Sequence, residues 1–517
     1  MRRRRIPPLP WAWAWGAIAL AFPWSNAFMS VATGMLGLAV LTRFGRLLGT
    51  MPEKPLSRAM VQAGWSLVLL VLWSALSTTW SGDMAASLND VRVKLPLVAG
   101  GLALVAMARE SAWPHARWVD GVLKLALVSA LIASLTVVFL DVWNGGEQGG
   151  RQASRFISHI RFGLWWALLL PWVCHRLATY WRWLALAGAL LAWTWMESLT
   201  GLLVAVALAP WWLSAWLSHR NRSEEEPILT WPAAGWVNRT GLMVLAAALP
   251  LLGLLVWAMP TSLPDADALA SNSAGGEAYV HKLDRRVTEN GHHVWVEVAW
   301  GELQSEWEDI SDVPFAQIEG ALVRFLSSKG LPKDRQGLSE LDAEELAAVE
   351  RGTTSVVELR GGPWTKRWNR FKYNWGEWLD GNRSPRASIL ARSVYQEVGA
   401  RAWAKIPAPL WLTGCGPGVD SEWLDTAYAE AFPDWPEGGR KRPHNQYLTL
   451  LLSAGLIGLC LFIWALKCLW THPPARPGVL LIALSCLAED TLETQAGVTL
   501  AIVALAWGTF MPGRRAL

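Results

Sequence analysis

The segment Arg440-Lys441-Arg442-Pro443-His444-Asn445-Gln446-Tyr447-Leu448 joins two unlike parts of the chain. It ends a polar stretch, residues 260–441, and opens an apolar run from Tyr447 to Trp470 that is long enough to cross a membrane as a helix. A histidine and three cations therefore stand at the mouth of a predicted membrane helix. Ionisable groups are costly at that depth, so those that occur there usually serve a function. His444 is thus the first candidate for a functional residue.

The composition is that of a membrane protein. The chain has 517 residues, of which 52% are hydrophobic and 17% charged, and its mean hydropathy is +0.23. A soluble enzyme of this length is more polar. The 37 tryptophans agree with many membrane crossings, because the amphipathic indole ring favours the headgroup region. The net charge of +4 gives no sign of nucleic-acid binding, and the five cysteines lack the spacing of a metal site.

Apolar runs of membrane-spanning length recur along the chain. They predict an all-α polytopic membrane protein with about twelve transmembrane helices. About nine of these lie in residues 1–259 and about three in 442–517, and the segment 260–441 forms one large loop domain between helices nine and ten. The predicted spans are residues 11–24, 26–42, 61–80, 94–108, 120–140, 160–177, 181–197, 199–218, 240–259, 446–469, 477–490 and 496–512.

The distribution of Lys and Arg predicts the orientation of these spans. In the loops that are cytoplasmic if the N-terminus is inside, Lys and Arg number 19. The opposite short loops hold five, which are Arg92, Lys94, Arg151, Arg155 and Arg161. The positive-inside rule therefore places both termini in the cytoplasm and the 260–441 loop, with His444, on the extracytoplasmic side. No cleavage site of small residues follows the N-terminal arginine run, which we interpret as a cytoplasmic anchor and not a signal peptide.

The loop segment has the sequence signals of a folded domain. Residues 280–298 partly alternate apolar and polar around Glu289-Asn290-Gly291, which predicts a hairpin. Residues 315–328 and 341–350 have helical periodicity, with a turn predicted at 334–337. Ser384-Pro385 predicts the start of a further helix that runs to about residue 404. The remaining signal is Thr413-Gly414-Cys415-Gly416-Pro417-Gly418, a glycine-rich turn without the GK[ST] ending of a phosphate-binding loop.

Two spaced motifs give the chain a family resemblance. Arg386-Ala387-Ser388-Ile389-Leu390 fits the pattern R-x3-L, and His444 followed by Gly455 fits H-x10-G. R-x3-L is a weak signal, since it also occurs at Arg43. In contrast, no other histidine in the chain is followed by a glycine after a gap of ten residues. With these two motifs, the layout of its predicted spans and the large loop between helices nine and ten, the chain resembles the O-antigen ligases. That superfamily also contains O-antigen polymerases and protein O-oligosaccharyltransferases. Ser198-Leu199-Thr200 departs from the Ser-Arg-Thr of many relatives, so any anion-binding role of that arginine must be filled elsewhere.

The resemblance implies a glycosyltransferase in the bacterial inner membrane. Its donor would be a glycan on undecaprenyl diphosphate, and its acceptor a sugar hydroxyl of lipid A-core on the periplasmic side. Negative charge develops on the departing diphosphate, and arginines bind phosphate oxygens in a bidentate way. Such charge-assisted hydrogen bonds contribute about 1.5–3 kcal/mol each. We therefore expect a reaction without metal or other cofactor, in which Arg161, Arg386 and Arg155 hold the diphosphate.

His444 is the expected general base for the acceptor hydroxyl, because imidazole titrates near the operating pH. Its neighbours Arg440, Lys441 and Arg442 are expected to favour the neutral imidazole. A direct role as donor to the diphosphate is the alternative. Asn445, Arg442 and Glu493 are expected to support the site, and Glu489, Asp490 and Glu493 to form ion pairs with its cations. Asp265-Ala266-Asp267 matches the D-x-D metal pattern, but so short a pattern is weak.

Three functions remain open at this stage. The first is O-antigen ligase, and the second is the related chemistry in which another lipid-linked repeat or a protein hydroxyl is the acceptor. The third is a transporter or flippase with twelve helices. The large one-sided loop and the lack of detectable two-half symmetry argue against a transporter. The sequence does not separate ligase from polymerase, since both require an arginine-lined diphosphate site.

Overall fold

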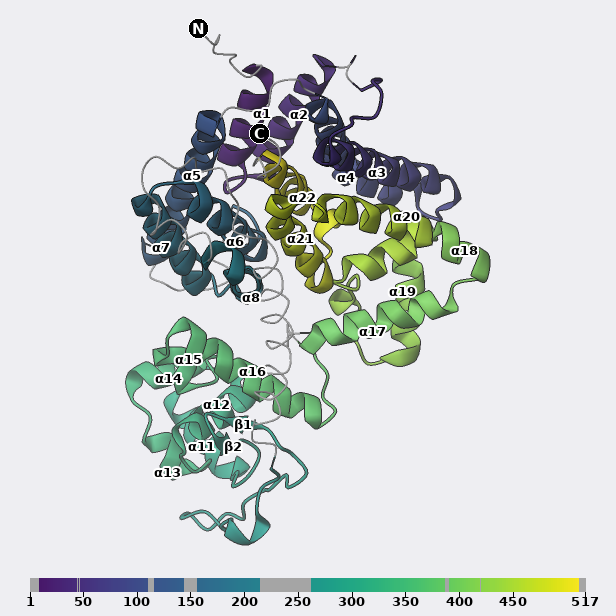
Figure 1. The fold of residues 1–517 in the computed structure, drawn as a ribbon. Helices are drawn as coiled ribbons and strands as arrows, with labels where there is room; N and C mark the ends of the chain where they lie inside the picture. The colour runs from purple at the N-terminus through teal and green to yellow at the C-terminus, as the bar shows by residue number, and fades with distance from the viewer. Residues whose placement is uncertain are drawn as a thin grey trace. The chain divides into compact units, whose positions relative to one another are not determined.

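The computed structural model describes residues 9–43, 45, 47–109, 116–143, 156–213, 262–385, 390–418 and 420–510. Helices dominate these residues, and the paired strands form one short two-stranded sheet (Figure 1). The chain divides into two compact units. We call residues 1–249 with 394–517 the apolar unit and residues 250–393 the inserted unit. Residues 394–441 thus belong to the apolar unit, although the sequence placed them in the 260–441 loop domain.

The apolar unit is built from helices with long hydrophobic faces. Four described helices are long and apolar enough to cross a membrane, namely Pro55–Trp80, Met84–Ala108, Trp118–Trp143 and Gln446–Trp470. Its described α-helices are α1 (Leu9–Ala21), α2 (Asn26–Leu41), α3 (Pro55–Ser77), α4 (Met84–Ala108), α5 (Ala116–Trp143), α6 (His159–Arg176), α7 (Thr179–Trp195), α8 (Leu199–Ala207), α17 (Leu390–Lys405), α18 (Ala408–Thr413), α19 (Asp420–Ala431), α20 (Gln446–Trp470), α21 (Arg476–Ala488) and α22 (Gln495–Trp507).

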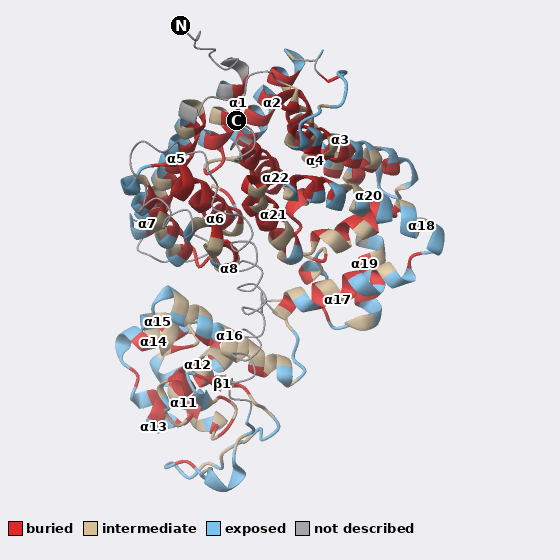
Figure 2. Ribbon diagram, in the orientation of Figure 1, coloured by how far each residue is buried: buried red, intermediate tan, exposed pale blue. Residues whose placement is uncertain are grey.

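These helices agree in position with the predicted spans. A helix lies at each predicted span except 240–259, which falls outside the described residues. The helices α2, α22 and 473–488 are apolar but shorter than the four long ones. Helix α22 is buried from Ala496 to Trp507, as Figure 2 shows for the centre of this unit. The all-α character of a membrane protein is therefore present, whereas the count of twelve spans and their orientation stay predictions.

Helix α4 begins earlier than the sequence predicted. The predicted span started at residue 94, but the helix starts at Met84, where the side chain of Asp83 accepts a hydrogen bond from the backbone N–H of Ala86. Arg92 and Lys94 consequently lie within the helix and not in a loop. Farther along, α4 packs closely on α3 through two glycines. The approach is so close that a Cβ added at Gly64 would clash with the backbone carbonyl of Gly101.

Helix α20 is interrupted at the glycine of the H-x10-G pattern. Gly455 has φ 65° and ψ −167°, a conformation that side chains other than hydrogen rarely allow. A Cβ there would lie 2.3 Å from the carbonyl oxygen of Leu412. The glycine-rich turn after α18 binds at this break, since the N–H groups of Cys415 and Gly416 donate to the carbonyls of Leu452 and Ser453 at 2.8 and 3.0 Å. The glycine thus lets another segment approach the opened helix.

The inserted unit has a hydrophobic core of its own, which includes Val294, Trp307, Leu322 and Phe325. Its hairpin pairs β1 (Thr288–Glu289) with β2 (His292–His293) in antiparallel register, and Asn290-Gly291 form the turn. Its described α-helices that have not yet been given are α11 (Trp300–Ile310), α12 (Phe315–Lys329), α13 (Arg335–Ser339), α14 (Ala343–Glu350), α15 (Val356–Arg360) and α16 (Pro363–Leu379).

Several local predictions for this segment are confirmed. The hairpin has the predicted turn, and α12 covers the predicted 315–328 helix. Helix α14 begins with a capping box between Asp342 and Glu345, close to the predicted start at 341. The predicted turn at 334–337 is instead the first part of the short helix α13, because Asp334 accepts from the N–H of Gly337 as an N-cap. The predicted start of the helix after Ser384 involves residues 386–389, which lie outside the described residues.

Candidate functional site

The candidate site is built on the first turn of α20. Asn445 is the N-cap, and its side-chain oxygen accepts from the N–H groups of Tyr447 and Leu448 at 3.0 and 3.3 Å. His444, directly before it, has the left-handed φ of 48°. For a residue with a side chain this conformation costs roughly 1–3 kcal/mol and persists when surrounding contacts impose it. The contact here is a hydrogen bond of 3.1 Å from the N–H of His444 to Oδ2 of Asp490.

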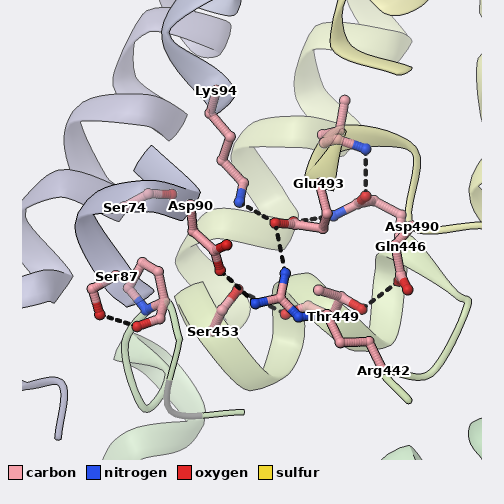
Figure 3. A network of polar contacts seen from close by, with 12 residues as sticks. Ser74, Ser87, Asp90, Lys94, Arg442, Gln446, Thr449, Ser453, Asp490 and Glu493 are labelled. Atoms are coloured by element: carbon pink, nitrogen blue, oxygen red, sulfur yellow. Dashed lines mark hydrogen bonds and ion pairs between the residues drawn. The ribbon is translucent and has the colours of Figure 1, made fainter. Parts of the chain in front are cut away.

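A buried ion network joins α4 to the segment between α21 and α22 (Figure 3). Glu493 receives Nζ of Lys94 at 2.5 Å and a guanidinium nitrogen of Arg442 at 3.2 Å. The other side of Arg442 binds Asp90 at 2.7 Å. Asp90 and Lys94 stand four residues apart and so share one face of α4. Two cations therefore meet two carboxylates, and this balance compensates for the burial of Lys94 and Glu493, whose side chains are 2% and 5% exposed.

Polar side chains of α20 hold the same segment in place (Figure 3). Gln446 donates to Oε1 of Glu493 at 3.0 Å and accepts from the N–H of Leu492 at 2.6 Å. Thr449 donates to Oδ1 of Asp490 at 2.6 Å. Two of the three carboxylates that interrupt the last two apolar runs, Asp490 and Glu493, are thus partners of α20. Their ion pairs and hydrogen bonds explain how they are accommodated among apolar helices.

The imidazole of His444 lies between a carboxylate and an aromatic ring. Its Nδ1 is 3.6 Å from Oε2 of Glu489, and the side chain is 27% exposed. The ring of Tyr395, from α17, lies 5.3 Å away at a tilt of 37°. Nδ1 is buried and makes no hydrogen bond within the described part of the chain. A small rotation toward Glu489 would bring Nδ1 within hydrogen-bond distance of that carboxylate.

Aromatic side chains support this position from the other side. Tyr395 packs edge-on against Trp435 at 5.9 Å, and Trp435 stacks on Tyr428 at 6.4 Å. The hydroxyl of Tyr428 donates to the carbonyl of Lys441 at 3.0 Å and accepts from its N–H at 3.2 Å. Burial raises the pKa of Tyr428 to about 12, so the phenol keeps its proton for this bond. The backbone before His444 is therefore tied to α19.

Two of the cations before His444 have carboxylate partners of their own, and their predicted effect on the imidazole stays a prediction. Arg442 is engaged by Asp90 and Glu493, and Arg440 is paired with Asp425 at 3.5 Å. The imidazole itself lies beside the carboxylate of Glu489, with Nδ1 at 3.6 Å from Oε2.

Arg161 reaches the same segment from the first turn of α6. One of its terminal nitrogens lies 3.3 Å from the carbonyl oxygen of Asp490 and 3.9 Å from Oε2 of Glu489. The side chain is 5% exposed. Glu489 therefore stands within 4 Å of both Arg161 and His444, and it links the predicted diphosphate-binding arginine to the predicted base.

The structure thus brings together part of the predicted site. Five of the predicted residues lie around the first turn of α20 and the 489–493 segment, namely Arg161, Arg442, His444, Asn445 and Glu493. Arg155 and Arg386 lie outside the described residues, so the predicted arginine set is incomplete here. Sequence reasoning missed Asp90, Lys94 and Tyr395 as members. The charged pair at the start of a predicted membrane span was the available signal for the first two, and no pattern marks Tyr395.

The D-x-D pattern lies at a short exposed turn. Asp265 uses its side chain to accept from the N–H of Asp267, and both residues are exposed. Among the residues that the structure describes, no group of three or more His, Cys, Asp or Glu side chains could hold a metal ion.

No protein-family model matches the chain, and no curated protein matches it. The site therefore has to be interpreted from its own geometry.

Proposed function

We propose that this protein is a membrane glycosyltransferase of the O-antigen ligase type. It would transfer a glycan from undecaprenyl diphosphate to a hydroxyl of lipid A-core at the periplasmic face of the inner membrane. The observation that carries the proposal is the His444 imidazole, partly exposed and 3.6 Å from Glu489, on a left-handed backbone at the mouth of an apolar helix. A strained, partly accessible histidine beside a carboxylate is typical of a general base.

In this mechanism His444 accepts the proton of the acceptor hydroxyl at Nε2 as the oxygen attacks the anomeric carbon. The bond between that carbon and the phosphate oxygen breaks, and the diphosphate leaves with the bonding electron pair. Glu489 orients the imidazole and stabilises the imidazolium. Arg161, with Arg155 and Arg386, would balance the charge that develops on the leaving group. Arg442, engaged by two carboxylates, keeps the helix start in place.

O-antigen polymerisation and protein O-glycosylation remain alternatives. In these reactions a second lipid-linked repeat or a protein hydroxyl is the acceptor, and the base and the leaving group are the same. A transporter receives less support, since a transport cycle does not require a histidine held in a strained conformation beside a carboxylate. Deleting the gene and separating the cell's lipopolysaccharide on a gel distinguishes the enzymes. A ligase predicts loss of all O-antigen with accumulation of the lipid-linked polymer, and a polymerase predicts single repeats on core.

The decisive experiment uses purified protein with an undecaprenyl-diphosphate-linked glycan and lipid A-core. We expect glycan transfer to continue in excess EDTA, because arginines replace a metal at the leaving group. Loss of transfer in EDTA that Mg²⁺ or Mn²⁺ restores would contradict the metal-free mechanism. Absence of transfer to any of the three acceptor types, with protein that is monodisperse in detergent, would remove the proposed function.

A further inference from the structure

Helix α16 in the inserted unit carries two different faces. Four of its seventeen residues are tryptophan, and it holds four cations against one carboxylate. One face is formed by residues at helical spacing, namely Asn369, Tyr373, Gly376 and the C-cap residue Asp380. This face packs on the unit. Asn369 donates to Glu289, Gly376 lies against the backbone of Val287, and Asp380 accepts from the N–H of Arg286 at 2.8 Å.

A second series with the same spacing is aromatic. It starts at Trp364, five residues before Asn369, and five residues correspond to about 140° around a helix. The aromatic series is therefore turned away from the face that packs on the unit. Trp368 stacks on Phe371 at 5.7 Å, and Phe371 stacks on Trp375 at 6.4 Å. The members of the aromatic face are Trp364, Trp368, Phe371, Trp375, Trp378 and Leu379.

The aromatic face is partly open to solvent, and cations flank it. Trp368 is 45% exposed and Leu379 is 38% exposed. Arg367 lies over the ring of Trp364 at 6.0 Å on one side, and Lys372 falls on the other side of the face by its helical position. A core helix would bury such aromatic residues, and a solvated helix would not carry so many of them.

We propose that this face of α16 binds the interfacial region of a phospholipid bilayer. Indole rings favour the headgroup level, where one edge is apolar and the other wet, and the flanking cations complement lipid phosphates. The lipid surface is also supplied by the chain itself. Both ends of the inserted unit continue into the apolar unit, whose long apolar helices require a bilayer, so the effective concentration of lipid near α16 is high.

This inference is independent of the proposed chemistry and can be tested on the full chain. All five cysteines are described, and Cys460 is the exposed one among them. In a Cys460→Ser background, Leu379→Cys places an environment-sensitive NBD label at the edge of the aromatic face and leaves every Trp intact. Asp309→Cys, an exposed position at the end of α11, provides the matched control. Both proteins are reconstituted in nanodiscs that contain lipids with spin-labelled headgroups.

We expect several-fold stronger quenching by the labelled lipids at position 379 than at position 309, together with weaker quenching by aqueous iodide. Replacing Trp368 and Trp375 by Ser should remove most of the difference, while thermal unfolding of the purified protein stays the same. Adding phosphatidylglycerol to phosphatidylcholine discs should increase the lipid quenching, and Lys372→Glu should reduce this dependence.

Two results would overturn the inference. Equal quenching by lipid at positions 379 and 309, with free access of iodide to both, would mean that α16 faces water. Protection from iodide without lipid quenching would mean that protein covers the face, either another part of this chain or a second copy. Cross-linking at low protein concentration would then distinguish coverage by another part of the same chain from coverage by a second copy.

Discussion

Both units bury an ion cluster, and the two clusters differ in what lies beside them. In the inserted unit, Glu289 is fully buried and receives Nε and a terminal nitrogen of Arg324 at 2.9 and 2.7 Å. The guanidinium of Arg324 also lies 3.5 Å from the ring centre of Tyr373. Asn369 donates to the same carboxylate, so hydrogen bonds and the aromatic ring enclose this cluster.

In the apolar unit, Glu493 with Lys94 and Arg442 is almost as deeply buried. Next to it, however, stands a histidine that is 27% exposed, left-handed in its backbone and close to a carboxylate. Burial of charge is thus common to both clusters, and what differs is the neighbouring group. The Glu493 cluster stands beside a strained, partly exposed titratable side chain, which is the kind of neighbour that makes it the candidate for chemistry.

The largest effect is expected for His444→Ala. Turnover should fall by about 100- to 10,000-fold, because the acceptor hydroxyl loses its base. Donor binding should change little, since the arginines are untouched. The measurement is the single-turnover rate and the donor affinity of purified protein. His292→Ala, at an exposed position in the inserted unit, is the control and should retain full activity. Full turnover in His444→Ala would show that the strained histidine beside the Glu493 cluster has no catalytic role.

Arg324→Ala tests the closed cluster. It leaves Glu289 buried without its cation, and breaking a buried pair in this way costs roughly 3–5 kcal/mol of stability. Replacing both partners, with Glu289→Leu and Arg324→Met, should cost much less, because no charge is left buried. Hydrogen exchange of peptides from β1 and α12 in the intact protein measures both variants. An effect of the double variant as large as that of the single one would mean that the ion pair is not the source of stability.

Gly455→Ala should destabilise the first part of α20. The new Cβ would meet Leu412 at 2.3 Å on a backbone with φ 65°. Strain of this kind costs about 1–3 kcal/mol before the clash is added. Gly121→Ala on α5, where a Cβ meets nothing within 4 Å, is the matched control and should be neutral or stabilising. Thermal unfolding in detergent compares the pair, and equal shifts would contradict the role given to the helix break.

A pH dependence is expected in the inserted unit. Burial lowers the pKa of Lys333 to about 8, and its Nζ donates to the carbonyl of His293 at 3.1 Å. Between pH 8 and the ordinary lysine pKa near 10.4, the unfolded chain therefore binds the proton and the folded chain does not. Stability should then rise with pH across that window. Lys333→Met should abolish the rise, as hydrogen exchange corrected for intrinsic rates can measure. The same slope in both proteins would show that Lys333 is not its source.

Local features of the inserted unit were predictable from the chain. The turn at Asn290-Gly291 was visible because glycine and asparagine tolerate positive φ, and both have it in the structure. Helices α12 and α14 followed from apolar periodicity. A turn was predicted where α13 lies, because a single helical turn has too few residues to show a period. Helices α11, α15 and α16 were not predicted.

The candidate site was predictable only in part. The position of His444 before an apolar run, and the carboxylates within the last runs, were visible because charge is costly there. Which carboxylate would face the histidine was not visible, since Glu489, Asp490 and Glu493 are nearly adjacent in the chain. Glu493 pairs with Lys94 and Arg442, and Glu489 remains beside the imidazole.

The pattern of residues along the chain was enough to predict that apolar helices dominate, where most of them lie, and that a polar, folded segment interrupts them. These properties depend on composition and period, which neighbouring residues already express. Tertiary structure alone decided that Asp90 and Lys94 meet Arg442 and Glu493, and that residues 394–441 pack with the apolar unit. Those contacts join residues far apart in the chain, and they form because each buried charge requires a partner that only the folded chain brings within reach.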